Sequence, residues 1–358
     1  KFRLPVLELL KRHGVEVVLV CPRGDDSAIL ESRGFRVIDW QLDRGGMNLI
    51  KECKALIALL RIYWREAPDA TQHVTIKPNL YGTIAARIKR VPIVINNWDG
   101  LGFVFSDSRR ARIVRTLLLP IMRLIFRTQA LWANFANNEI ADLFNSLGLA
   151  RPTRTWRFPP VGVDIDHFVP RRKSNAGPPV VLMASRLLWQ KGIGEFVRAA
   201  RILAYRGVKA RFVLCGAIDS ANPSAATVND VDAWQREGVV EILTYQTNMP
   251  DVLNKADIVV LPSYHEGLGT ILLEAAASGL PLVATDIPGC RLAVEDGLNG
   301  ILVQPRDHEG LADAIQRLVQ DQPLRTRFGQ ASRNRVLKRF SWEKVLDSYL
   351  ETYFECGL

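Results

Sequence analysis

The chain has 358 residues, of which 48% are hydrophobic and 23% charged, and a formal net charge of +10. This length favours two domains, each large enough for its own core. No apolar run reaches the roughly 18–20 residues of a membrane-spanning helix, and the five cysteines form no CxxC pair, so neither a disulfide framework nor a zinc site is indicated. We expect a reduced, cytoplasmic protein.

The chain opens on helix spacing rather than on a strand. Phe2–Arg12 has the pattern of an amphipathic helix, whereas a nucleotide-binding half normally begins with a strand and a glycine turn. We therefore expect that the first strand of the N-terminal domain is missing. Strand-like runs then alternate with helical patterns, as is typical of parallel sheets with crossover helices. In the first half we expect strands at 16–22, 73–77, 92–96 and 131–134.

Positive charge is concentrated in this first half. Residues 1–170 contain 25 Lys and Arg against 16 Asp and Glu. The densest segment, Ser108–Trp132, has no acidic residue and six arginines, at 109, 110, 112, 115, 123 and 127. A basic, largely apolar segment suits an anionic membrane surface, but a core-facing helix with a solvated basic face explains the pattern as well. Nucleic acid is disfavoured, because no binding module for it is present.

A polar Pro/Gly stretch at 170–179 separates the two halves. After it, strands are expected at 179–185, 210–216, 240–245, 257–263, 282–285 and 300–303. The alternation predicts an α/β protein with two Rossmann-like, doubly wound domains that face each other across a cleft. We expect the domains at 1–170 and 171–340, followed by a C-terminal helix at 341–358 that crosses back to the first domain.

Two glutamates follow the strand expected at 257–263. Glu266 lies in a Gly-rich turn at the carboxyl end of that strand, where open α/β sheets bind ligands, and Glu274 lies in the next helix. Eight helical residues rise about 12 Å, so the two carboxylates suit the two ends of an elongated ligand such as a sugar nucleotide. Solvated helix-face glutamates would show the same spacing. The backbone N–H groups that would face an anion between the carboxylates belong to Gly267, Leu268, Gly269 and Thr270.

Two cations follow the strand expected at 179–185. Arg186 and Lys191 lie in its loop, and Gly192 opens the next helix. A rigid guanidinium fork and a mobile ammonium together suit a leaving diphosphate. The competing explanation is that both residues are solvated cations of a loop, but their position after a buried strand disfavours it. Gly216 and Tyr245 lie at the ends of two further strands and complete the candidate residues for binding such a sugar nucleotide, with Tyr245 near its base.

These segments resemble one enzyme family. Residues 257–289, with both glutamates, resemble the signature of the retaining glycosyltransferases of family 4 (group 1), which have the GT-B fold. Residues 180–200 resemble the family's G-R-L-x-x-x-K-G segment, although Ala184-Ser185 replaces its usual small residue and glycine. Residues 73–92 and 100–105 resemble a subgroup that transfers N-acetylated amino sugars to polyprenyl-diphosphate carriers or lipid-linked glycans. With further matches at 161–168, 285–299 and the C-terminal helix, the similarity covers nearly the whole chain.

The resemblance implies a hexosyltransferase of bacterial surface polysaccharide or glycan biosynthesis. A UDP-linked sugar would pass, with retention, from the second domain to a lipid-linked or glycan acceptor on the first, at the inner face of the cytoplasmic membrane. In this family the residues matching Glu274 and Glu266 hold the ribose and the donor sugar, and those matching Arg186 and Lys191 neutralise the diphosphate. No metal or other cofactor is then required.

The acceptor side is less well defined. Many relatives have a histidine in the N-domain loop that is Asn96-Asn97-Trp98-Asp99 here. Asp99 is therefore the candidate acceptor-side catalytic residue, although a turn or cap role explains it equally well. A GT-B-fold sugar-nucleotide epimerase and a non-catalytic GT-B scaffold are the alternative functions.

Overall fold

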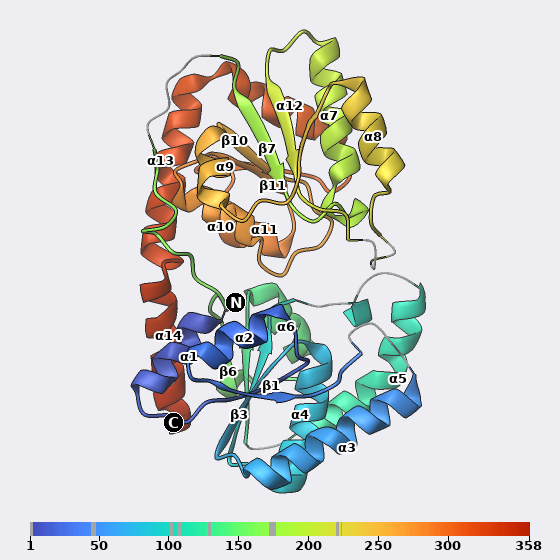
Figure 1. The fold of residues 1–358 in the computed structure, drawn as a ribbon, viewed down its shortest axis with the longest axis vertical. Coiled ribbons are helices and arrows are strands. Elements are labelled where there is room, and N and C mark those ends of the chain that lie inside the picture. The colour runs from blue at the N-terminus through green and yellow to red at the C-terminus, as the bar shows by residue number, and fades with distance from the viewer. Residues whose placement is uncertain are drawn as a thin grey trace. The chain divides into compact units, whose positions relative to one another are not determined.

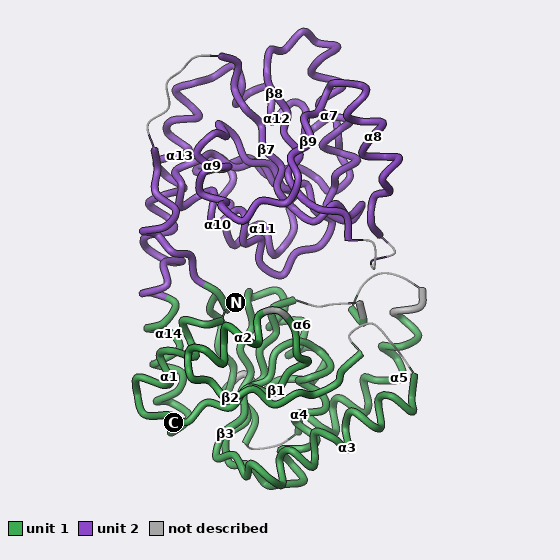
Figure 2. Tube along the Cα trace, in the orientation of Figure 1, with its two compact units in different colours: residues 1–161, 345–358 green, residues 162–344 purple. Residues whose placement is uncertain are grey.

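The computed structural model describes residues 3–43, 48–100, 103–105, 109–127, 130–171, 177–219, 222 and 224–358 (Figure 1). The chain divides into two compact units, residues 1–161 with 345–358 (unit 1) and residues 162–344 (unit 2) (Figure 2). None of the helices in the described ranges has both the length and the apolar character that a membrane crossing requires.

Unit 2 is built on a parallel sheet with the strand order β12-β11-β10-β7-β8-β9. Helices cover both faces of this sheet (Figure 1). Its elements are β7 (Val180–Ala184), η3 (Trp189–Lys191), α7 (Ile193–Tyr205), β8 (Arg211–Cys215), α8 (Val228–Glu237), β9 (Glu241–Leu243), α9 (Met249–Lys255), β10 (Ile258–Leu261), α10 (Thr270–Ala277), β11 (Leu282–Thr285), α11 (Pro288–Ala293), β12 (Gly300–Val303), α12 (His308–Gln320) and α13 (Gln322–Arg339).

The central strands of unit 2 are almost entirely apolar because both of their faces are buried. In β7, Val181 and Met183 pack into the core beneath α7 and α12, while Leu182 and Ala184 pack into the core beneath α10. Successive side chains of a strand point to opposite faces, which produces this division. The strands β10 and β11 are likewise buried at every position. The polar side chains that follow these strands therefore gather at the carboxyl edge of the sheet.

Unit 1 contains, in its described part, two separate parallel sheets, β1-β2 and β3-β4-β5-β6. Its elements are α1 (Leu4–Arg12), β1 (Val18–Cys21), α2 (Asp25–Ser32), β2 (Arg36–Asp39), α3 (Leu49–Glu66), β3 (Ala70–Val74), α4 (Ile76–Lys89), β4 (Ile93–Trp98), η1 (Phe103–Phe105), α5 (Arg109–Phe126), β5 (Leu131–Phe135), α6 (Asn138–Ser146), η2 (Pro152–Arg154) and β6 (Thr155–Trp156). The last helix, α14 (Trp342–Cys356), packs on this unit, where Tyr353 donates a hydrogen bond to Gln72 of β3 (2.7 Å).

One strand prediction was wrong in position. The strand expected at 73–77 is β3 at Ala70–Val74, and α4 already begins at Ile76. Thr75 and Ile76 are β-branched, so they resemble strand residues in sequence, but Thr75 has a φ of 74° and turns the chain into the helix. The short strands β2 and β6 were not predicted.

The border between the units lies before the Pro/Gly stretch. The first segment of unit 1 ends at Val161, whereas we expected the break at 170. The intervening segment is tied to unit 2, because Val163 forms a β-bridge with Ser341 and Arg333 donates hydrogen bonds to the carbonyl oxygens of Phe168 and Ile165. These contacts join residues far apart in the sequence, which composition cannot reveal.

Candidate functional site

The candidate site lies at the carboxyl edge of the unit 2 sheet. The loop after β7 carries Arg186 and Lys191, and the loop after β10 carries Glu266. Because β7 and β10 are parallel neighbours, both loops leave the sheet at the same edge. The loop after β11 leads into α11 at this edge as well. The fold thus assembles one site from segments that lie far apart in the chain.

Lys191 and Glu266 form an ion pair. The Lys191 Nζ lies 2.5 Å from the Glu266 Oε1, and the two side chains are 19% and 9% exposed. A pair this well shielded is screened far less by salt than one on the open surface. The sequence predicted each residue for the donor site separately, and the structure brings them into direct contact.

Two glycines allow the main chain around this pair to pack closely. A Cβ on Gly192 would lie 2.0 Å from the carbonyl oxygen of Pro262, and one on Gly289 would lie 2.3 Å from the carbonyl oxygen of Glu266. Gly192 also has a φ of +80°, which side chains rarely tolerate. The beginnings of α7 and α11 are therefore packed directly against the loop that carries Glu266.

Glu274 lies on α10, and its carboxylate makes no hydrogen bond or ion pair with the residues that the structure describes. Burial raises its pKa to about 7, because the charged form loses water without gaining a donor. Within the same described part of the chain, the N–H groups of Gly267 through Thr270 donate to no acceptor, and the Gly269 N-cap of α10 has no side chain that could accept from them. The site therefore has a vacant acceptor on Glu274 and vacant donors at the start of α10.

Arg186 does not join the Lys191–Glu266 pair. Its guanidinium NH1 lies 2.9 Å from the Asp219 Oδ2, and the two side chains are 61% and 29% exposed. Exposed pairs of this kind contribute little free energy, so the guanidinium can exchange Asp219 for another anion at small cost. The sequence contained no signal for Asp219, which lies in the loop after β8.

Gly216 and Tyr245 were both predicted to bind the donor. A Cβ on Gly216 would lie 1.9 Å from the carbonyl oxygen of Ser185, so this glycine is needed for close packing of two strand ends. Tyr245, just after β9, is 67% exposed. Its side chain is accessible to a ligand.

Asp99, the candidate on the acceptor side, lies just after β4 of unit 1 and is bound by Arg3. The Arg3 NH2 donates to both carboxylate oxygens, at 2.8 and 2.7 Å, and the Arg3 NH1 donates to the Tyr349 hydroxyl at 2.9 Å. Arg3, the N-cap residue of α1, thereby connects the end of β4 with α14. Sequence reasoning missed Arg3, since nothing in the sequence links it to a residue 96 positions away.

A buried histidine near the same end of this sheet was also missed. The Nδ1 of His73, in β3, donates a hydrogen bond to the Asn96 Oδ1 (2.7 Å), and its Nε2 accepts one from the Tyr63 hydroxyl (2.7 Å). Burial lowers the pKa of His73 to about 4, so the ring is neutral at pH 7. A Cβ on Gly82 would lie 2.2 Å from the ring, which leaves no room for a ligand there. We therefore interpret His73 as part of the core.

The basic segment of unit 1 is mostly the helix α5. On one face it buries Met122, Ile125 and Phe126 in the core of unit 1. A second set of apolar side chains, four, four and three residues apart, is 49–68% exposed and comprises Ile113, Leu117, Ile121 and Leu124. Arg112, Arg123 and Arg127 are exposed nearby. The side chains of Arg109 and Arg110 lie outside the described part of the chain.

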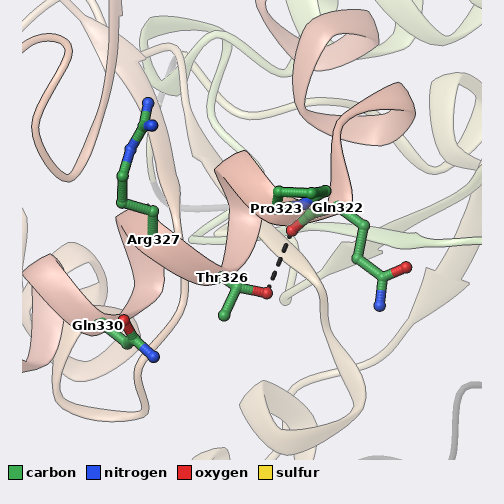
Figure 3. A pocket seen from close by; sticks show the side chains of 5 residues that line it. All are labelled: Gln322, Pro323, Thr326, Arg327 and Gln330. Carbon is green, nitrogen blue, oxygen red and sulfur yellow. Dashed lines mark hydrogen bonds between the residues drawn. The ribbon is translucent and has the colours of Figure 1, made fainter.

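Other sites are not supported by the described residues. A hollow on α13 is lined by Gln322, Pro323, Thr326, Arg327 and Gln330, and has a single charged group (Figure 3). In the described ranges, no group of three or more His, Cys, Asp or Glu side chains is arranged to hold a metal ion. Asp164 of the sequence Asp164-Ile165-Asp166 accepts hydrogen bonds from the N–H groups of Asp166 and His167, so it stabilises its own turn.

Comparison with known families identifies the class of protein. Residues 164–335 match the family described as glycosyl transferases group 1, and residues 2–130 match the family described as glycosyl transferase 4-like. The chain belongs to the group 1 glycosyltransferases, is an enzyme of that class, and has the GT-B fold. The expected family and architecture are thus confirmed.

Individual relatives extend over the whole chain. An N,N'-diacetylbacillosaminyl-diphospho-undecaprenol α-1,3-N-acetylgalactosaminyltransferase of Campylobacter jejuni is 28% identical over 98% of this chain and 94% of its own length. A UDP-Gal:α-D-GlcNAc-diphosphoundecaprenol α-1,3-galactosyltransferase of Escherichia coli is 24% identical over 98% and 92%. Among solved structures, Anabaena HepE in complex with UDP has a TM-score of 0.77 at 20% identity, covering 99% of this chain and 96% of that one.

Proposed function

We propose that this glycosyltransferase moves a sugar, such as an N-acetylated amino sugar, from a UDP-sugar to a polyprenyl-diphosphate-linked or other lipid-linked acceptor, with retention at the anomeric carbon. The proposed place of this reaction is bacterial surface polysaccharide or glycan biosynthesis. In this proposal unit 2 binds the donor and unit 1 the acceptor. The names of the Campylobacter and Escherichia coli relatives, which specify undecaprenyl-diphosphate-linked acceptors, support the choice of acceptor.

The observation that carries the proposal is the Lys191–Glu266 pair at the carboxyl edge of the sheet, together with Glu274 on α10, the helix that follows the loop carrying Glu266. The vacant Glu274 carboxylate suits the ribose hydroxyls, which would donate to it. The N–H groups of 267–270 suit the diphosphate, because helix N-termini favour anions. The Glu266 carboxylate suits hydroxyls of the donor sugar, and its salt bridge keeps Lys191 beside them. These groups together match the ribose, the diphosphate and the sugar of a UDP-sugar.

In the proposed reaction, catalysis depends on stabilising the leaving diphosphate. As the bond from the anomeric carbon to the diphosphate breaks, negative charge develops on the phosphate oxygens, and Lys191 and the helix amides are positioned to offset it. Arg186 would contribute after exchanging Asp219 for phosphate. The leaving phosphate can accept the proton of the acceptor hydroxyl, so no protein base is required on that face. Asp99, already bound by Arg3, would shape the acceptor side rather than remove a proton.

The test is transfer by the purified protein. It is incubated with UDP-N-acetylglucosamine, UDP-N-acetylgalactosamine or UDP-galactose, with and without a polyprenyl-diphosphate-linked sugar. We expect acceptor-dependent release of UDP and an α-linked product by NMR, and Glu266→Ala should abolish both. Interconversion of free sugar nucleotides without acceptor would instead indicate an epimerase. A protein that neither binds UDP nor releases it would indicate a scaffold.

We further propose that unit 1 contacts an anionic membrane surface through α5. The exposed apolar side chains Ile113, Leu117, Ile121 and Leu124 would enter the interface between headgroups and acyl chains. The arginines beside them would add roughly 1 kcal/mol each near an anionic leaflet. A helix that only covers the core would bury its apolar residues. This one leaves a second apolar set in solvent, which supports the membrane interpretation.

Vesicle sedimentation tests this contact. Wild-type protein should pellet with phosphatidylglycerol vesicles at low salt and much less at high salt, because salt screens charge over about 10 Å. The double variant Leu117→Gln/Leu124→Gln, and separately Arg112→Gln/Arg115→Gln, should release it. Val228→Gln, which changes a similarly exposed residue of unit 2, is the control. If wild-type protein does not bind these vesicles at low salt, the proposal is contradicted and a soluble acceptor is favoured.

A further inference from the structure

A buried carboxylate beside the candidate site has no part in the chemistry proposed above. Glu195 lies in the first turn of α7 and is 3% exposed. Its Oε1 accepts a hydrogen bond from Arg198, and its Oε2 accepts one from the Tyr264 hydroxyl at 2.8 Å. A buried carboxylate is costly unless it is paired and hydrogen-bonded. A side chain that only filled this space would be apolar, so the contact with Tyr264 needs an explanation.

Tyr264 is held from three directions. Its hydroxyl donates to Glu195, its main-chain N–H donates to the carbonyl oxygen of Gln190 (2.9 Å), and its ring lies 4.7 Å from the guanidinium carbon of Arg306. The Ser263 hydroxyl donates to the same Gln190 oxygen at 3.2 Å. Loss of water and the hydrogen bond to Glu195 together raise the pKa of Tyr264 to about 12, so its hydroxyl keeps the proton that it donates.

These contacts join the two loops that carry the Lys191–Glu266 pair. Gln190 immediately precedes Lys191 in the loop after β7, and Tyr264 lies two positions before Glu266 in the loop after β10. Glu195, at the start of α7, fixes the Tyr264 ring from the side of the Lys191 loop. A lysine side chain has four rotatable bonds, so its ammonium keeps one place only if its main chain and its partner are both held.

We propose that Glu195 and Tyr264 are positioning residues, which hold the Lys191 ammonium against Glu266 for the transfer step. This inference rests on the proposed sugar transfer. Neither residue touches the reacting atoms. Both act through the relative placement of two loops, and a misplacement of about 1 Å at a reacting centre can lower a rate by about a hundredfold. Turnover should therefore depend on the hydrogen bond between Tyr264 and Glu195, while UDP affinity should not.

The Tyr264→Phe variant isolates this hydrogen bond. It keeps the ring beneath Arg306 and the main-chain bond to Gln190, and removes only the hydroxyl. We expect kcat to fall about tenfold to a hundredfold, with the Kd for UDP within about twofold of wild type. Tyr205→Phe is the matched control, because Tyr205 is 95% exposed at the end of α7, and it should behave as wild type.

Variants of the partner distinguish positioning from general damage to the fold. Glu195→Gln keeps an oxygen that accepts from Tyr264 and should retain most of the turnover, whereas Glu195→Leu should match Tyr264→Phe. The double variant Glu195→Leu/Tyr264→Phe should lose no more than either single variant, because both act through one bond. If the fold-losses in kcat of the two single variants multiply in the double variant, or if UDP affinity falls as much as kcat, the proposal is overturned.

A readout without catalysis separates this inference from the proposed function. Hydrogen exchange followed by mass spectrometry on unliganded protein should show faster exchange of peptides covering 186–192 and 262–269 in Tyr264→Phe, and no change in Tyr205→Phe. If wild-type protein transfers no sugar, the proposed function fails while this measurement still tests whether Tyr264 holds the loops. Unchanged exchange in Tyr264→Phe would overturn the positioning role even in an active enzyme.

Discussion

Replacing Glu274 with Gln should make the folded protein more stable at pH 8 and weaken its binding of UDP. Burial raises the pKa of this carboxyl from an ordinary 4.5 to about 7. Because one pKa unit corresponds to about 1.36 kcal/mol, ionising Glu274 costs roughly 3 kcal/mol more in the folded protein than in the unfolded chain. The neutral amide removes this cost without changing the size of the side chain.

The pH dependence follows from the direction of the shift. Between pH 4.5 and 7 the folded state retains a proton that the unfolded state has released, so Glu274 lowers stability progressively as the pH rises through this window. Below pH 4.5 both states are protonated and the difference between wild type and Glu274→Gln should vanish. Above pH 7 it should be complete. For a unit of this size the melting temperature should change by about 2–4 °C per kcal/mol.

Nucleotide binding should respond in the opposite direction. Ribose hydroxyls donate best to the ionised carboxylate, which makes up about one-tenth of the population at pH 6 and about nine-tenths at pH 8 for a pKa of about 7. Wild-type protein should therefore bind UDP about tenfold more tightly at pH 8 than at pH 6. Glu274→Gln, measured in parallel by calorimetry, corrects for the titration of the UDP phosphate itself. We expect its affinity at pH 8 to be lower by roughly 1.5–3 kcal/mol.

Two results would refute this reasoning. Denaturation curves of Glu274→Gln that match wild type at both pH 5 and pH 8 would mean that the carboxylate is not desolvated. A UDP affinity that is the same in wild type and variant at every pH would mean that Glu274 does not contact the nucleotide.

Three further predictions concern other residues of the candidate site. Lys191→Ala and Arg186→Ala should each lower kcat by about 10²–10³-fold and raise KM by less, because the two cations stabilise charge that develops during the reaction. Steady-state kinetics in which only KM changes would mean that the two residues bind the substrate but do not stabilise the transition state. Glu266→Ala should abolish transfer while calorimetry shows nearly unchanged UDP affinity, and a loss of affinity as large as that of Glu274→Gln would contradict separate roles for the two glutamates. Gly289→Ala should destabilise unit 2 in thermal unfolding, since its Cβ would lie 2.3 Å from the Glu266 carbonyl oxygen, and a stable, active variant would show that the loop can move away.

Much of the fold was predictable because burial leaves a clear pattern in the sequence. The central strands of unit 2 are buried on both faces, so their sequences are nearly continuous apolar runs. The sequence therefore predicted their positions to within a few residues. The strand β3 was misplaced because its neighbours Thr75 and Ile76 have strand-like side chains but begin a helix. The division between units was misplaced because long-range bonds of Arg333 decide it.

The sequence by itself determined the class of protein and pointed to the segments of the candidate site, because a strand end followed by a Gly-rich turn and a helix is a local pattern. Only the tertiary structure decided which side chains meet. Lys191 and Glu266 are 75 residues apart, Glu195 and Tyr264 are 69 apart, and Arg3 and Asp99 are 96 apart. The sequence around a cation or a carboxylate does not show whether that side chain is solvated or paired with an opposite charge. Its partner, and therefore its charge state and its role, depend on which strands of the sheet are neighbours and on how closely glycines let their loops approach.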